Sequence, residues 1–329
     1  MYSKNEQNKL KNMYTGIYGD IVGVPAESLI FYLWNLRKAM KIEREVVTEA
    51  RRIIQTKIYY APIIDELLKI VSPDLMEDYF EKYSPEKRKY RFSDDTVCLI
   101  ATMDAILCKE KVKDSKADND YYFPFKEKYQ EWCGKYLEAG YGGWFQKWIT
   151  DPNAQPYNSF GNGAAMRIAP IGYLHNTNSF IQTGIKSCSV THDNPEGIRG
   201  GLAVVEAIAA ARNGGTKIDI KKKIQETYFY DLTRDLETVR KDYKFHVESQ
   251  FSVPESIIAF LESTSAVNAV ENAISLGGDT DTQAMIAGCI ADAFYGKNQI
   301  LYTVKKEVEE HLPHEMILVL EMFYKTYVK

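Results

Sequence analysis

The chain has 329 residues, of which 45% are hydrophobic and 26% are charged, and it carries a net charge of −4. This acidic balance argues against nucleic acid as the main ligand. The N-terminus is polar, and no segment approaches the roughly 20 consecutive apolar residues that a membrane-spanning helix needs. We therefore expect a cytoplasmic protein with no membrane partner.

Apolar residues recur at three- and four-residue spacing along most of the chain, a pattern typical of helices. The clearest segments are 6–21, 37–54, 196–212 and 304–327. Runs of alternating β-branched residues are scarce, and no Gly/Ser/Pro-rich linker divides the chain. We predict an all-α, multi-helix fold in one compact domain covering residues 1–329.

The first predicted helix runs into the sequence Gly19-Asp20-Ile21-Val22-Gly23-Val24-Pro25-Ala26-Glu27. Glycine and proline are poor helix formers, so we expect the two glycines and Pro25 to end this helix and to leave Glu27 on its exit. Taken alone, a carboxylate in such a position is a solvated loop residue. Next to other acidic residues, it becomes a candidate metal ligand.

Two acidic clusters stand out further along the chain, Ser93-Asp94-Asp95-Thr96 and Gly278-Asp279-Thr280-Asp281-Thr282. Each precedes an apolar helical run, which places both at predicted helix N-termini, and ordinary capping explains either one alone. Together they supply four carboxylates and four hydroxyl groups, far more than capping needs. Without a cation, this many acceptor groups at buried helix starts would repel one another. We therefore predict a metal site.

All the candidate ligands of this site are hard oxygens, and the sequence contains no closely spaced set of His and Cys ligands. Oxygen ligands favour Mg²⁺ or Mn²⁺ over zinc. Neither cluster continues with the glycine and distal glutamate of a twelve-residue calcium loop. The residues alone leave open whether one ion or two would bind.

Five motifs recur in a characteristic order: Gly19-Asp20-Ile21-Val22-Gly23 with Glu27, Ser93-Asp94-Asp95-Thr96, Gly161-Asn162-Gly163-Ala164-Ala165-Met166-Arg167, Thr191-His192 and Gly277-Gly278-Asp279-Thr280-Asp281-Thr282. In these motifs the sequence resembles the ADP-ribosylglycohydrolase family, which includes dinitrogenase-reductase-activating glycohydrolase and the ADP-ribosyl-acceptor hydrolases. The resemblance extends from about residue 12 to residue 297. It implies an all-α fold with a binuclear magnesium or manganese centre and hydrolysis of the glycosidic bond between ADP-ribose and an acceptor.

The resemblance also implies roles for individual residues of this centre. Glu27 and Asp95 are the expected catalytic residues, and Glu27 would leave a metal to act as acid or base. The family pattern commonly has threonine where this chain has Ser93, and the hydroxyl group is retained. The expected ligands of two Mg²⁺ ions, with Mn²⁺ as the alternative, are Glu27, Ser93, Asp94, Asp95, Asp279, Asp281 and Thr282.

Two glycine-bearing segments are candidates for binding the diphosphate of ADP-ribose. Gly140-Tyr141-Gly142-Gly143-Trp144 can direct backbone N–H groups toward an anion, although a helix-ending turn is the simpler explanation of the segment alone. By resemblance, a glycine-rich loop at this place contacts the diphosphate. Phe160-Gly161-Asn162-Gly163 precedes a predicted helix start near Ala164. Arg167, inside that helix, is either a phosphate ligand or a structural hydrogen-bonding residue.

His192 lies just before Asp193-Asn194-Pro195, where Asn194 can cap a helix and Pro195 can occupy its first position. A histidine in that setting is usually a local structural residue. By resemblance, it borders the substrate pocket. The expected substrate-binding residues are Gly140, Tyr141, Gly142, Gly143, Phe160, Asn162, Gly163 and His192.

The acceptor stays open, with arginine-linked, serine-linked and smaller ADP-ribosyl compounds as candidates. Two long polar segments could form a lid or a partner surface: a probable helical insertion at about 38–90 and the segment 219–252. A phosphatase of the haloacid-dehalogenase type needs a β-strand before Asp279, where residues 273–278 read as a helix end. A non-catalytic ADP-ribose-binding or structural member of the same fold is the alternative, but the acidic ligands are all present, which favours a hydrolase.

Overall fold

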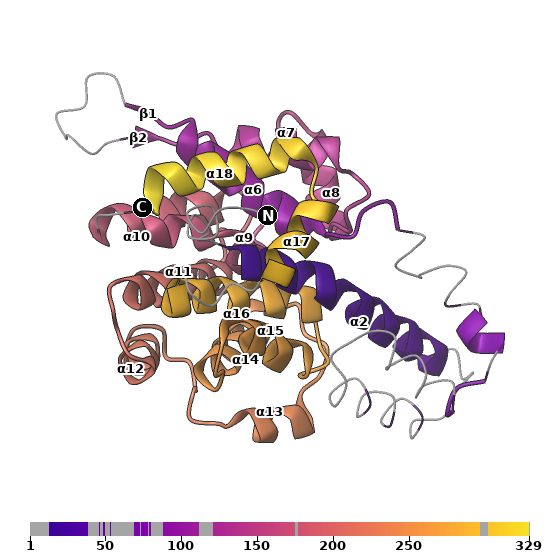
Figure 1. The fold of residues 1–329 in the computed structure, drawn as a ribbon. Coiled ribbons are helices and arrows are strands. Elements are labelled where there is room, and N and C mark those ends of the chain that lie inside the picture. The colour runs from indigo at the N-terminus through magenta and orange to yellow at the C-terminus, as the bar shows by residue number, and fades with distance from the viewer. Residues whose placement is uncertain are drawn as a thin grey trace.

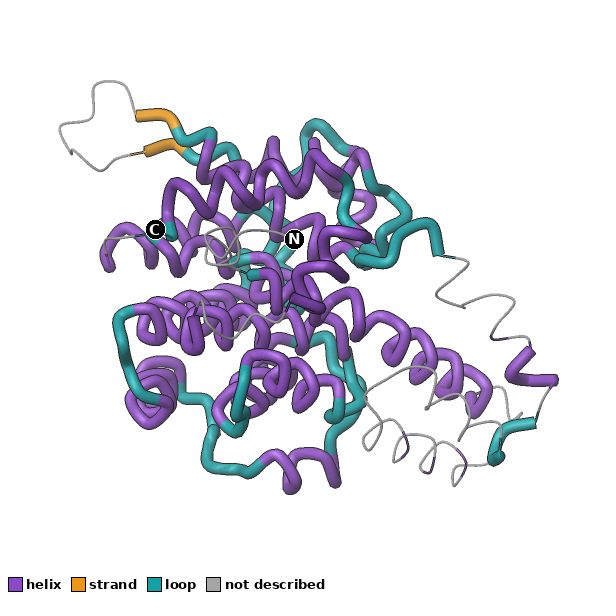
Figure 2. Tube along the Cα trace, in the orientation of Figure 1, coloured by secondary structure: helices purple, strands orange, loops and turns teal. Residues whose placement is uncertain are grey.

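The computed structural model describes residues 13–38, 46, 49, 53, 69–72, 74–77, 79, 88–111, 121–174, 177–296 and 302–328. Helices make up most of this part of the chain (Figure 2), so the predicted all-α fold class is confirmed. The strands β1 and β2 form a two-residue antiparallel pair in which Glu110 lies opposite Tyr122. The elements in chain order are α2 (Tyr14–Lys38), α6 (Asp94–Leu107), β1 (Glu110–Lys111), β2 (Tyr121–Tyr122), α7 (Phe125–Lys135), α8 (Gly143–Thr150), α9 (Gly163–Arg167), the 3₁₀ helix η2 (Ala169–Tyr173), α10 (Thr177–Ser189), α11 (Pro195–Arg212), α12 (Lys217–Tyr228), α13 (Leu236–Asp242), α14 (Ser249–Leu261), α15 (Ala266–Ile274), α16 (Thr280–Tyr295), α17 (Tyr302–His311) and α18 (His314–Tyr327).

Helix α16 occupies the centre of the fold. Every residue from Thr280 to Asp292 is buried. The helix packs against α2, α11, α14 and α15, which lie around it in Figure 1. Most of its residues are apolar or small, as expected of a helix with neighbours on every face. The second acidic cluster therefore begins a helix that is surrounded by protein.

Glycines bring α2 and α16 into direct backbone contact. A Cβ atom added at Gly23 would lie 2.6 Å from the Cα atom of Asp281, and one added at Gly288 would lie 2.6 Å from the carbonyl oxygen of Thr15. Gly19 makes a similar approach to the backbone of α16. Any side chain at these positions would push the helices apart, so glycine allows the close approach.

Hydrogen bonds join the two helices at both ends of this contact. The Thr280 hydroxyl donates to the carbonyl oxygen of Gly23 at 2.8 Å, and the Thr15 backbone N–H donates to the Asp292 carboxyl group at 2.8 Å. Both pairs are buried, where a hydrogen bond defines relative position well. Together they fix the position of α2 along α16.

The predicted end of the first helix is wrong. Helix α2 continues through Gly23 and Pro25, so Glu27 lies within a helix and not on a loop. Pro25 lacks a backbone N–H and disfavours a helix interior. Beyond it, Leu29 and Tyr32 are buried in the core, and this burial together with the contact to α16 offsets the local preference.

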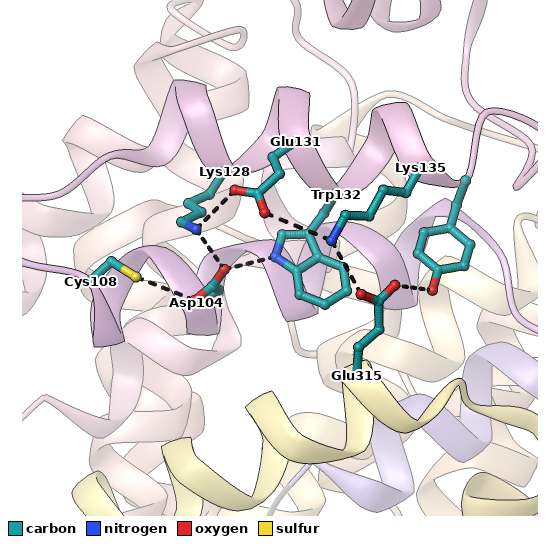
Figure 3. Close-up of polar contacts among 8 residues, drawn as sticks. Asp104, Cys108, Lys128, Glu131, Trp132, Lys135 and Glu315 are labelled. Atoms are coloured by element: carbon teal, nitrogen blue, oxygen red, sulfur yellow. Dashed lines mark hydrogen bonds and ion pairs between the residues drawn. The ribbon is translucent and has the colours of Figure 1, made fainter.

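Helices α6, α7 and α18 form a second packed group (Figure 1). Figure 3 shows the polar contacts between them. Asp104 of α6 accepts a hydrogen bond from the Trp132 indole N–H at 2.9 Å, and Glu315 of α18 accepts one from the Tyr136 hydroxyl at 2.7 Å and pairs with Lys135 at 3.2 Å. Exposed ion pairs contribute little stability, so these contacts chiefly define how the helices align. They anchor the helix that begins with the first acidic cluster.

The remaining sequence predictions are met to different degrees. The helix predicted at 196–212 is α11, whereas the segment 304–327 forms α17 and α18 with a break before the second, where Pro313 is the N-cap residue. Most of the segment 37–54 and of the predicted insertion at 38–90 lies outside the described residues, so the domain organisation stays a prediction. Within the described ranges, no helix has the length and apolar character needed to cross a membrane.

The close contact between α2 and α16 is testable with a single methyl group. Gly288→Ala should lower the free energy of unfolding by about 1–3 kcal/mol, because the added Cβ meets backbone atoms that cannot move aside. Urea unfolding of the two proteins measures the difference. Gly134→Ala, on the exposed side of α7 with no heavy atom within 4 Å of the added Cβ, is the matched control and should cause no loss. Equal stability of the Gly288 variant and the wild type would contradict the packing.

Candidate active site

A cavity of about 400 Å³ lies where the N-termini of α6, α8 and α16 meet the side of α2. Residues from all the motifs that the sequence singled out line this one cavity. Of the predicted site residues, those in its wall are Glu27, Ser93, Asp94, Asp95, Gly140, Gly142, Gly143, Asn162, Gly163, His192, Asp279, Asp281 and Thr282. Tyr141 and Phe160 are not part of the wall.

The carboxylates of the two acidic clusters meet in two groups. One oxygen each from Asp20, Asp95 and Asp281 lie within 4.8 Å of one another, and so do oxygens of Glu27, Asp279 and Asp281. Asp281 belongs to both groups, which is the arrangement expected of a carboxylate between two cation positions. Asp94 lines the cavity but belongs to neither group.

Asp20 is a site residue to which the sequence analysis assigned no role. Its carboxyl group is fully buried and accepts hydrogen bonds from the backbone N–H of Ser93 at 3.0 Å, from the N–H of Thr96 at 3.2 Å and from the Thr96 hydroxyl. These donors occupy most of its acceptor capacity. Asp20 therefore holds the start of α6 against α2, and its closeness to the other carboxylates follows from that position.

Asp95 combines two supported contacts with one unpaired oxygen. Its Oδ2 accepts hydrogen bonds from the hydroxyl groups of Ser93 and Thr282, each at 3.1 Å. Its Oδ1 is buried and has no partner among the described residues. A buried carboxylate oxygen without a donor is costly unless a cation or a proton satisfies it. The donor set therefore fits a hard divalent cation.

Electrostatic repulsion among the carboxylates of the cluster also favours a bound cation. Burial and the nearby charge of Asp281 raise the pKa values of Glu27, Asp95 and Asp279 well above their ordinary values. For Asp94 the same two causes raise the pKa to about 8. The protein alone would hold protons in this cluster at neutral pH, and bound cations would replace them.

The first glycine-bearing segment presents backbone to the cavity. No heavy atom lies within 4 Å of a Cβ added at Gly142 or Gly143, so both positions face open space. Gly140 has a φ of +109°, which favours glycine. The segment leads into a helix, since α8 starts at Gly143. The simpler explanation from the sequence was a turn that ends a helix. The Tyr141 side chain is buried in the core, with its ring 5.7 Å from that of Phe145.

The second glycine-bearing segment supports the acidic cluster. The Asn162 side-chain amide donates a hydrogen bond to the Asp279 carboxylate at 2.7 Å, and its backbone N–H donates to Val247 at 2.8 Å. Asn162 thus orients a candidate metal ligand while lining the cavity. Phe160 is half exposed and outside the cavity wall.

Two cationic residues complete the surroundings. Arg88 lines the cavity, and its positive charge tends to lower the pKa values of Glu27 and Asp94. Burial and the charge of Asp281 have the larger, opposite effect, so both pKa values remain raised. The sequence carried no signal for Arg88, because it lies outside every motif. Arg167 is 1% exposed, lines the cavity and donates a hydrogen bond to the carbonyl oxygen of Ser187, which favours the structural role over that of a phosphate ligand. Asn194 caps α11 through a bond from the N–H of Glu196 at 2.9 Å, as predicted.

A family model described as ADP-ribosylglycohydrolase matches residues 6–326. The chain belongs to the ADP-ribosylglycohydrolase family. The human ADP-ribosylhydrolase ARH3 is 26% identical over 265 residues, which are 64% of this chain and 72% of that protein. The uncharacterized protein YegU of Escherichia coli K12 is 27% identical over 185 residues, or 46% of this chain and 55% of that protein.

A solved structure described as an ADP-ribosylglycohydrolase-related protein complex has a TM-score of 0.53 and 18% identity, covering 72% of this chain and 82% of its own. At this identity the likeness concerns the fold. The predicted family and fold are confirmed, and the chain is a glycosidic-bond hydrolase. The family acts on ADP-ribosylated substrates and depends on metal ions.

The raised pKa of Asp94 predicts a pH dependence of stability. Between its ordinary pKa of 3.8 and the folded value of about 8, the folded protein holds a proton that the unfolded chain has released. The free energy of unfolding of chelator-treated protein should therefore fall as pH rises through this window. Urea unfolding at several pH values measures the slope. Asp94→Asn removes the carboxyl group and should make the free energy of unfolding depend less steeply on pH. An unchanged pH dependence would contradict a raised pKa of Asp94.

Proposed function

We propose that this protein removes ADP-ribose from an acceptor by divalent-cation-dependent hydrolysis of the glycosidic bond. The observation that carries the proposal is the pair of carboxylate groups that share Asp281, at a cavity whose wall also includes open glycine backbone. The acidic part suits cations, and the glycine segment leaves room for a diphosphate. Membership of a family that acts on ADP-ribosylated substrates supports the same reaction.

The acidic side chains would hold Mg²⁺ or Mn²⁺, and two ions match the two carboxylate groups. When bound, such ions would supply positive charge to orient ribose hydroxyl groups and to polarise a water molecule. Because the Ser93 hydroxyl donates a hydrogen bond to Asp95, we expect serine to serve at this position as threonine does in the family pattern. The proposed ligands are Glu27, Ser93, Asp94, Asp95, Asp279, Asp281 and Thr282.

Glu27 and Asp95 are the proposed catalytic residues. Glycoside cleavage develops positive charge at the anomeric carbon and needs proton transfer to the leaving group or from water. Glu27 lies on the cavity wall with a raised pKa, which suits a group that exchanges protons. Because Glu27 belongs to α2, its carboxylate would leave a metal by rotation of the side chain, with no movement of the backbone required.

The glycine segment at Gly140, Gly142 and Gly143 is the proposed diphosphate site, with Asn162, Gly163 and His192 beside it. The acceptor stays open between arginine-linked, serine-linked and smaller ADP-ribosyl compounds. The segment 219–252 reaches the cavity through Val247, which is half exposed and lines the wall. That segment is therefore a candidate for acceptor contacts.

The metal assignment is tested by Asp281→Ala. The substitution removes the carboxylate common to both groups, so metal content after dialysis against Mg²⁺ or Mn²⁺ should fall and hydrolysis should be lost while helicity persists. Elemental analysis, circular dichroism and an assay of ADP-ribose release measure the three quantities. Asp242→Ala, at an exposed position on α13, is the control. Undiminished metal-dependent activity of the Asp281 variant would contradict the proposal that these carboxylates bind the catalytic cations.

Free ADP-ribose should inhibit competitively and raise the melting temperature in the presence of Mg²⁺, because it binds only the folded state. Gly142→Val fills open space in the cavity without an internal clash, so it should weaken ADP-ribose binding and leave the melting temperature of the free protein nearly unchanged. Gly134→Val, at an exposed position that is not part of the cavity wall, should bind normally. Binding without any turnover in the wild type would favour the non-catalytic alternative.

Glu27→Gln preserves shape and removes the ionisable group. We expect ADP-ribose affinity to be largely retained and kcat to fall by about 10²–10⁴, the usual effect of losing an acid or base. Steady-state kinetics on a verified ADP-ribosyl substrate measures both parameters. Wild-type kcat and KM in this variant would mean that Glu27 is not the acid or base, and that Asp94, Asp95 or Asp279 performs the proton transfer.

A further inference from the structure

Three buried polar side chains form a hydrogen-bonded chain, and both of its ends, Arg167 and His192, line the cavity. Arg167, Thr191 and His192 are exposed by 1%, 0% and 4%, respectively. An Arg167 Nη2–H donates to the Thr191 hydroxyl oxygen at 2.7 Å, and this oxygen lies 2.7 Å from Nδ1 of His192. Arg167 is the last residue of α9, and the other two lie between α10 and α11.

Arg167 is held in place by contacts on several sides. Its guanidinium group lies over the Tyr129 ring, 4.1 Å from the ring centre, and Nη2 also donates to the carbonyl oxygen of Ser187 at 3.3 Å. A guanidinium group has donors and no acceptor, and it stays protonated in proteins. The Thr191 oxygen must therefore accept from Arg167.

This fixes the direction of the next hydrogen bond. If Nδ1 of His192 carried a proton, the Thr191 oxygen would face two donors, and its own hydrogen would have no acceptor among the described residues. An unpaired donor in a fully buried position is costly. The Thr191 hydroxyl therefore donates to Nδ1, and the ring proton of His192 resides on Nε2.

The Nε2 edge of the ring faces the glycine-bearing wall. A Cβ atom added at Gly163 would lie 3.2 Å from Nε2, and one added at Gly161 would lie 3.7 Å from it. His192 lines the cavity, and within the described ranges its Nε2 makes no hydrogen bond. Burial and the charge of Arg167 lower the pKa of His192 well below its ordinary value, so the ring is neutral.

We propose that Arg167 and Thr191 are positioning residues that fix His192 as a neutral Nε2–H donor directed into the cavity, where it donates to an acceptor oxygen of the bound ADP-ribosyl group. The identity of that ligand rests on the proposed function. The position of the ring proton is a property of the protein alone and is measurable without substrate. The two parts can therefore fail separately.

The test begins with ¹⁵N spectra of histidine-labelled protein, with the His192 signals assigned by their loss in His192→Gln. We expect the wild type to show a single Nε2–H form at pH 7, with Nδ1 shifted by a hydrogen bond. Thr191→Ser should preserve this pattern. Thr191→Val, which keeps the shape and removes the hydroxyl, should abolish the Nδ1 shift. An Nδ1–H form or an imidazolium ring in the wild type would overturn the proposal.

Calorimetric titration with ADP-ribose and Mg²⁺ tests the contact with the ligand. Thr191→Val and His192→Ala should weaken binding by about 3- to 10-fold, the usual range for one hydrogen bond, whereas Thr191→Ser should bind close to wild type because it keeps the hydroxyl group that positions His192. Equal affinity of the valine, serine and wild-type proteins would overturn the positioning role. If the wild type does not bind ADP-ribose, the proposed function fails, and the ¹⁵N spectra still decide where the proton resides.

Discussion

The direct backbone contact between α2 and α16 is the constraint on which the rest of the site depends. Gly23 and Gly288 leave no space for side chains between the two helices, and the bond from Thr280 to Gly23 fixes their relative position. The contact places Glu27 beside the start of α16, where Asp279 and Asp281 lie. A wider separation would move Asp20 and Glu27 of α2 away from Asp281, so the geometry of the cation site is a consequence of glycine packing in the core.

The cost of this arrangement is electrostatic. The fold gathers buried carboxylates whose pKa values are raised by burial and by the charge of Asp281, and it leaves one oxygen of Asp95 without a donor. Such a cluster is unfavourable in the protein alone and becomes favourable when cations bind. Asp20 differs from its neighbours because backbone and hydroxyl donors already satisfy it. It connects α2 to the start of α6 and so helps to assemble the cluster.

Hydrogen bonds between neighbouring side chains set the orientation of residues that line the cavity. Asn162 donates to Asp279, and Thr191 relays the fixed hydrogen-bond direction of Arg167 to His192. In both cases a buried donor determines which atom of the neighbouring side chain is available to a ligand. The motif around residues 161–167 therefore acts largely through its neighbours, whereas the open backbone at Gly142 and Gly143 faces the cavity directly.

The sequence by itself determined the all-α fold class, the two helix starts at Ser93 and Asp279, and the cap at Asn194, because helix periodicity and capping are local signals. The hard-oxygen donor set and the glycine segments could also be identified from residue types alone. Only the tertiary structure decided that α2 continues past Pro25, that Asp20 joins two helices and that Tyr141 is directed into the core. These outcomes depend on contacts between residues far apart in the chain, and burial against α16 outweighs the local preference of glycine and proline to end a helix.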